Sequence, residues 1–120
     1  MSVRRVKTYT AQTGYVYEYY FVGQRPALPD DPLAPSTEFI FDVSADRKTI
    51  FAVSVFLLPW ALENFAADRG RALSNPEQYA AAKLRLQQGF DETANMVQDG
   101  RRLVVESEAL LALLQSVGID

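Results

Sequence analysis

The sequence contains neither cysteine nor histidine. Without cysteine the chain cannot form a disulfide, a thiolate metal site or a cysteine nucleophile. Without histidine it lacks the commonest general base near neutral pH and the commonest ligand for transition metals. A serine–histidine–aspartate site is therefore excluded within this chain. We expect no bound metal and no cofactor, and the sequence does not favour an enzyme.

Long apolar runs and glycine-rich phosphate motifs are also missing. The longest apolar stretch runs from Ile50 to Leu62 and contains Ser54 and Pro59, whereas a membrane helix needs about 20 apolar residues. The first residues of the chain do not have the pattern of a secretory signal. No Walker loop and no dinucleotide fingerprint occurs. These absences lead us to expect a cytoplasmic protein that does not contact the membrane.

The chain has 120 residues, of which 48% are hydrophobic, and a formal net charge of -3. This length and this apolar content are typical of one folded domain with its own core. An acidic chain has no general attraction to nucleic acids, so we do not expect nucleic-acid binding. The expected domain covers residues 1–120, with a proline-rich internal loop at residues 24–36.

Two predicted β-hairpins occupy the first half of the chain. The central one joins Glu38–Val43 to Thr49–Leu58 through a short polar turn, and both of its strands are rich in β-branched and aromatic residues. The other joins Val3–Ala11 to Tyr15–Val22, with Gly14 supplying the turn. Four prolines between Gln24 and Ser36 exclude a helix there and predict a long surface connection.

Helices dominate the second half. Pro59 and Gly70 predict the two ends of a first helix, and Ser74 with Glu77 forms the pattern of a capping box. The second helix is expected to run to about Gln98, with an apolar stripe that ends at Val97. Its outer side is predicted to carry Arg85, Gln88, Asp91, Glu92 and Asn95.

A short strand, Leu103–Glu106, and a last helix capped by Ser107 complete the chain. The predicted order is ββββααβα, with three helices. Strands that come first and helices that come later indicate an α+β fold with a mainly antiparallel sheet of four to five strands.

A tyrosine-rich strand and three carboxylates are the candidate ligand-binding residues. Such tyrosines could stack on single-stranded nucleic acid or line a small-ligand pocket, and cross-strand packing alone also accounts for them. The carboxylates are the acid–base candidates that remain, and a pocket beneath the proline-rich loop is where they could act. The candidates are Tyr15, Tyr17, Tyr19, Glu18, Glu38 and Asp42.

The last helix has a broad apolar side, wider than one packing face requires. Two-fold pairing is the commonest way for a small chain to cover such a surface, so we expect a homodimer. The candidate interface residues are Leu110, Leu111, Leu114 and Trp60. The leading hypothesis is a non-enzymatic module that binds itself or another protein. The alternatives are a small-ligand-binding protein or minor enzyme, and a nucleic-acid binder that uses the tyrosine strand.

Overall fold

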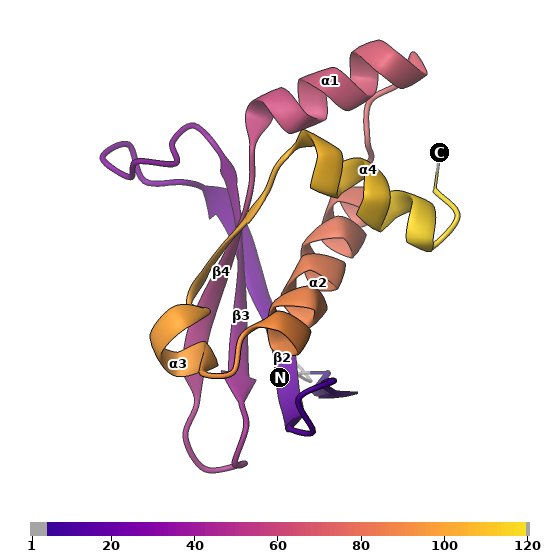
Figure 1. Cartoon of the computed structure of the whole chain (residues 1–120). Coiled ribbons are helices and arrows are strands. Elements are labelled where there is room, and N and C mark those ends of the chain that lie inside the picture. Colours follow the sequence, from indigo (N-terminus) through magenta and orange to yellow (C-terminus); the bar gives the residue numbers. More distant parts are fainter. Residues whose placement is uncertain (1–4, 120) are drawn as a thin grey trace.

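The computed structural model describes residues 5–119, in which one five-stranded sheet and four helices are present (Figure 1). The strands lie side by side in chain order, and all neighbours are antiparallel except β4 and β5, which are parallel. The predicted α+β class with a mainly antiparallel sheet is therefore confirmed. The strands are β1 Lys7–Thr10, β2 Val16–Pro26, β3 Thr37–Ser44, β4 Phe51–Leu57 and β5 Arg102–Val105.

The helices lie along one face of the sheet and beyond one of its ends. In Figure 1, α2 runs along the sheet, whereas α1 and α4 lie together at the end where β4 and β5 finish. No helix between residues 5 and 119 is long and apolar enough to cross a membrane. The helices are α1 Pro59–Arg69, α2 Asn75–Glu92, α3 Met96–Asp99 and α4 Ser107–Ser116.

The first hairpin forms where it was predicted, with different ends. Gly14 adopts a φ of 96° in the turn between β1 and β2, a conformation that suits glycine. The predicted start at Val3 lies outside the described residues. β2 continues beyond Val22 because a bulge there restores its pairing with β3, so that Arg25 lies opposite Glu38. The proline-rich loop therefore spans residues 27–36, and its prediction over 24–36 was too long.

The two faces of the sheet differ. One face is covered by α2, because the apolar side chains of β3 and β4 on that side pack against α2 residues in one cluster. The opposite face carries polar side chains and is covered in part: Phe56 is buried there, but Ala52 is exposed. The buried residues where α2 packs on this face include Phe39, Phe41, Val43, Val53 and Val55 of the sheet and Ala82, Leu86 and Phe90 of α2.

The second helix ends earlier than its pattern predicted. α2 stops at Glu92, Thr93 turns to an extended conformation, and Asn95 caps the short helix α3 by accepting a hydrogen bond from the Gln98 backbone N–H. Because α3 begins separately after Asn95, its residues do not continue the apolar stripe of α2: Met96 is buried and Val97 is 51% exposed. The predictions of three helices and of a buried Val97 were therefore wrong.

The capping box that begins α2 and the glycine that ends α1 are both present. In α4 the cap is Glu106 and Ser107 is the first helical residue, which corrects the predicted cap. The end of α4 follows the sequence pattern: Gly118 has a φ of 78°, and the Ile119 N–H donates to the Leu114 carbonyl over 2.9 Å. This is the Schellman arrangement expected of a glycine after a helix.

Candidate functional site

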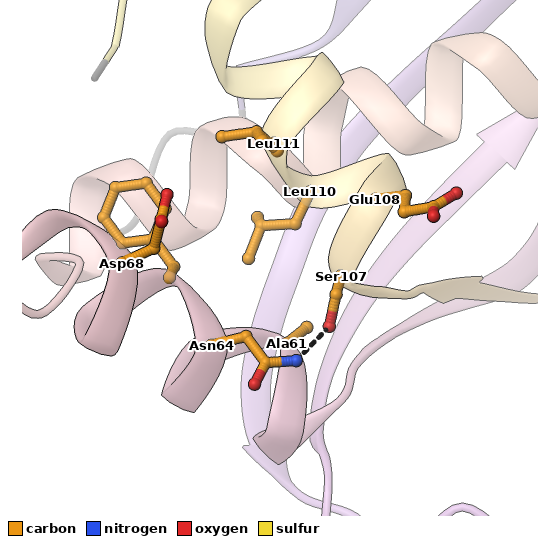
Figure 2. A pocket seen from close by; sticks show the side chains of 8 residues that line it. Ala61, Asn64, Asp68, Ser107, Glu108, Leu110 and Leu111 are labelled. Carbon is orange, nitrogen blue, oxygen red and sulfur yellow. Dashed lines mark hydrogen bonds between the residues drawn. The ribbon is translucent and has the colours of Figure 1, made fainter.

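A groove between α1 and α4 is the candidate functional site (Figure 2). Its volume is about 360 Å³, and its walls come from one side of each helix. In Figure 2 the Leu110 side chain projects between the two helices, whereas Glu108 points away from the groove. The lining residues are Ala61, Asn64, Phe65, Asp68, Ser107, Glu108, Leu110 and Leu111.

The local sequence explains why the two helices meet here. β4 and β5 are parallel neighbours, so the helices that follow them begin at the same end of the sheet. The Leu58 N–H donates to the Val105 carbonyl over 3.4 Å, which joins the starts of the two helices. Pro59 opens α1, where its missing N–H costs no helical hydrogen bond.

Small side chains on α1 leave the groove open. Among residues 59–69, only Ala61 and Phe65 are buried, because α1 packs mainly on α4. An alanine contributes little volume, so the space beside it stays unfilled. The groove floor is apolar, since Leu110 is 1% exposed and forms part of the protein core.

Three of the four polar side chains that line the groove, those of Asn64, Ser107 and Asp68, have a partner. Asn64 Nδ2 donates to Ser107 Oγ over 2.8 Å and ties the two helices at one end (Figure 2). Asp68 Oδ2 lies 3.5 Å from Arg69 Nε. Catalytic sites use converging polar groups that face the substrate. The Asn64–Ser107 bond instead joins the two walls of the groove.

Trp60 stands beside the groove on the first turn of α1. The sequence predicted an interface residue here, and Trp60 is 52% exposed. It lines a second, wider hollow of about 560 Å³ together with Glu106, Ser107, Glu108 and Ala109. Ser107 and Glu108 line both hollows, so the two form one continuous surface.

The predicted interface residues separate into two groups. Leu110 and Leu114 are 1% and 0% exposed and belong to the chain's own core, where α4 packs on α1 and α2. Leu111 is half-buried and lines the groove, and Trp60 lines the adjoining hollow. Leu111 and Trp60 are therefore the two predicted residues whose side chains a partner can reach. The pattern of α4 alone did not indicate Asn64 or Phe65, which the opposite helix contributes.

The candidate tyrosines lie on the helix-covered face of the sheet. Tyr17 and Tyr19 are each 2% exposed. The Tyr17 ring stacks on Phe90 with a centroid separation of 4.2 Å, and burial raises its pKa. Tyr19 Oη accepts a hydrogen bond from Gln87 Nε2 over 2.9 Å. Buried rings cannot stack on a nucleic-acid base, which leaves Tyr15 as the exposed tyrosine of these three.

The candidate carboxylates lie on the opposite face, each with a partner. Glu38 is buried, pairs with Arg25 Nε at 3.0 Å and accepts from Ser54 Oγ at 2.5 Å. Glu18 pairs with Arg47 at 3.0 Å. Asp42 accepts from Tyr20 Oη at 2.6 Å. The sheet thus separates these carboxylates from Tyr15, Tyr17 and Tyr19.

A small hollow on this polar face brings two of the carboxylates together. Glu18 and Asp42 line it with Tyr19, Tyr20 and Arg47, although the Tyr19 ring packs on Phe41 and Phe90, and its volume is about 130 Å³. Ligand pockets usually hold about 300–1,000 Å³, and the carboxylates here are already paired. Within residues 5–119, no group of three or more carboxylates is placed to hold a metal ion.

A comparison of the chain with protein-family models, with curated proteins and with solved structures finds no match. The interpretation of the groove therefore rests on its own geometry and chemistry.

Proposed function

We propose that this protein is a protein-interaction module that binds a partner through the groove between α1 and α4. The observation that carries the proposal is an apolar groove of about 360 Å³ that adjoins a hollow lined by the half-exposed Trp60. Tryptophan is enriched among the residues that contribute most to protein interfaces. Exposed apolar surface next to a groove is typical of interaction sites.

Another protein chain suits this groove better than a small substrate. The groove runs between two helices, which is the arrangement that accepts a helix of a partner. Three of its four polar residues are paired, in the Asn64–Ser107 and Asp68–Arg69 contacts, and Glu108 points away from the groove, so they do not converge on an empty centre. A partner would gain chiefly by covering Leu111 and Trp60.

Two single substitutions on α4 test this proposal. Leu111→Glu places a charge in the groove, whereas Ala112→Glu places the same charge on the exposed side of the same helix. We expect proteins that co-purify with the wild-type chain from its own cells to be retained by the Ala112 variant and lost with the Leu111 variant. Their binding is then measured again with the purified partner. Equal retention by both variants, with equal melting temperatures, would contradict the proposal.

Self-association through the same groove is the alternative proposal, since the sequence predicts a homodimer. Light scattering across a dilution series decides it, because a dimer of this kind dissociates on dilution and in the Leu111→Glu variant. A monomer mass at every concentration contradicts the homodimer. That result leaves a different protein as the partner.

A further inference from the structure

We infer that the segment bound in the α1–α4 groove is a basic amphipathic helix of another protein, with apolar side chains toward Leu111 and cationic side chains toward Trp60. This inference rests on the proposed function and specifies its partner.

The walls of the groove indicate a helix as the occupant. Both walls are α-helices, whose backbone N–H and C=O groups are bonded within each helix. An extended strand laid between them would find no backbone partners for its own polar groups, and unpaired backbone groups are costly in apolar surroundings. A helix satisfies its backbone internally and presents only side chains. The groove therefore fits a partner helix.

The length of the groove sets how much of that helix is held. Its α1 wall extends from Ala61 to Asp68, and its α4 wall from Ser107 to Leu111. Seven residue steps along a helix cover about 10 Å, or two turns. Two turns present apolar side chains at positions i, i+3, i+4 and i+7 of a partner. A short amphipathic segment is therefore sufficient to fill it.

The charges around the groove indicate a basic partner. α1 and the segment from Glu106 to Ser116 carry four carboxylates, at Glu63, Asp68, Glu106 and Glu108, and one cation, Arg69. Arg69 already pairs with Asp68. The nearby Arg71 lies over the Phe65 ring at 5.5 Å and is bonded to Glu77 through both terminal nitrogens.

The end of the groove near Trp60 is the most acidic part. Glu63 follows Trp60 by three residues on α1 but lines neither hollow, because the groove side of α1 carries Ala61, Asn64, Phe65 and Asp68. Glu106 and Glu108 line the hollow that Trp60 shares. The N-termini of α1 and α4 also lie here, each equivalent to about half a positive charge. The two carboxylates of Glu106 and Glu108 outweigh those two helix ends, which together equal about one positive charge.

An exposed indole beside carboxylates is a combination that favours a cation. The face of a tryptophan attracts an ammonium or guanidinium group through its quadrupole, and the carboxylates add direct ion pairs. A lysine or arginine of the partner therefore fits the hollow of Trp60, Glu106 and Glu108. Two copies of this chain would instead bring like-charged rims together, which favours an unlike partner.

Trp60 is the single tryptophan of the chain, so its fluorescence reports the site directly. The probes are three synthetic peptides of about 14 residues, about four helical turns, with one leucine stripe and no tryptophan. Their remaining positions carry lysine, glutamine or glutamate. We expect the lysine peptide to bind, to shift the Trp60 emission to shorter wavelength, and to bind more weakly as salt is added.

Two triple variants of equal net charge distinguish attraction of the lysine peptide by carboxylates at the groove from attraction by the net charge of the protein. The rim variant carries Asp68→Asn, Glu106→Gln and Glu108→Gln, which remove the three carboxylates that line the two hollows. The control carries Asp30→Asn, Glu92→Gln and Asp99→Asn, which are exposed acids away from the groove. We expect the rim variant to weaken binding of the lysine peptide about tenfold, since exposed ion pairs each contribute modestly. The control variant should bind as the wild type does.

Each other result overturns the inference. If the glutamine and lysine peptides bind equally, the inference of a basic partner is wrong, while the proposal that the groove binds a partner still stands. Equal weakening by both triple variants means that only net charge acts. If no peptide binds and Leu111→Glu abolishes a dimer, the occupant is a second copy. If no peptide binds and no partner or dimer depends on Leu111, the inference and the proposed function both fail.

Discussion

Gly89 on α2 lies so close to Leu103 on β5 that a Cβ atom added at Gly89 would come within 2.8 Å of Leu103 Cδ1. Helix propensity alone assigns glycine a cost of about 1 kcal/mol relative to alanine in a helix interior. At this position the small residue lets the helix approach the sheet. The glycine therefore contributes to packing between α2 and β5.

We predict that Gly89→Ala is not stabilising, in contrast to the propensity estimate. The gain of about 1 kcal/mol from alanine is opposed by overpacking, which typically costs 1–3 kcal/mol. In a Leu103→Val background the two Cδ atoms are gone, and Gly89→Ala should then raise the free energy of unfolding by about 1 kcal/mol. Urea denaturation of the four proteins measures this coupling. Equal effects in both backgrounds would show that the contact has no energetic role.

The sequence predicted much of the fold because local signals agreed with it. The hairpin turn at Gly14, the capping box at Ser74 and the glycine ends of α1 and α4 each depend on neighbouring residues alone, and each is present. The break after Glu92 was missed because the apolar spacing continues through it. Only the side chain of Asn95, which starts a new helix, marked the break.

Residues that act across distant segments could not be predicted from periodicity. Arg85 was expected on the outer side of α2, yet it is half-buried and its Nε donates to the Val104 carbonyl over 3.1 Å. The groove depends in the same way on α1 and α4, which are more than 35 residues apart in the chain. Leu111 and Trp60 were recognised from their own helices. Their joint surface required the parallel pairing of β4 and β5.

Asp91 joins the end of α2 to the first hairpin, and its removal should loosen that hairpin. It accepts hydrogen bonds from Tyr9 Oη at 2.7 Å and from the Gln12 backbone N–H at 2.9 Å. The bond to Asp91, followed by burial, raises the pKa of Tyr9 above its ordinary value of 10.0. A raised pKa means that this contribution to stability is present below pH 10 and is lost as the pH rises further.

We expect Asp91→Asn to lower the pKa of Tyr9 and to speed amide exchange in Lys7–Thr10. The pKa is measured by nuclear magnetic resonance on the tyrosine ring carbon bonded to oxygen. Glu92→Gln is the control, because Glu92 is the exposed neighbour. An unchanged Tyr9 titration in the Asp91 variant would mean that this hydrogen bond does not hold the proton on the phenol.

The capping box at the start of α2 predicts a measurable loss of stability in Ser74→Ala. Ser74 Oγ accepts from the Glu77 N–H at 3.3 Å, and the Glu77 carboxylate accepts from the Ser74 N–H at 3.0 Å. Removing such a cap typically costs about 0.5–2 kcal/mol. Glu77→Ala should not add its full effect in the double variant, because both residues serve one arrangement. Strict additivity in thermal or urea unfolding would contradict the reciprocal cap.

The Glu77 carboxylate also makes the stability of the folded state depend on pH in the acidic range. Hydrogen bonds from Arg71, and then from Ser74, lower the pKa of Glu77 from 4.5 to about 2. A lowered pKa stabilises the folded state above pH 4.5, and this contribution is lost as the pH falls toward 2. The difference in unfolding midpoint between the wild type and Glu77→Gln should therefore shrink across that range. If the difference in unfolding midpoint stays constant from neutral pH to pH 2, the loss of stability in Glu77→Gln comes from the changed shape of the side chain and not from its lost charge.

Two adjacent arginines before and within β5 have different roles, and this difference predicts what holds the proline-rich loop. Arg102 Nη2 lies 2.7 Å from Asp31 Oδ1, and its guanidinium lies 4.5 Å from the centre of the Phe56 ring. Arg102, together with the Leu33 N–H, lowers the pKa of Asp31. Arg101 instead donates to the Ala52 carbonyl on β4 over 2.5 Å. Only the second arginine of the pair reaches the loop.

We therefore expect Arg102→Met to speed amide exchange in residues 28–34 severalfold, while Arg101→Met leaves exchange in the loop unchanged. Methionine keeps a long apolar side chain that can cover Phe56, so the substitution mainly removes the ion pair. Lowering the pH should have a similar effect in the wild type, because protonation of Asp31 breaks the same contact below its ordinary pKa of 3.8. Hydrogen exchange followed by nuclear magnetic resonance measures the loop directly. If both arginine variants loosen the loop equally, β5 as a whole supports it and the Asp31–Arg102 pair does not.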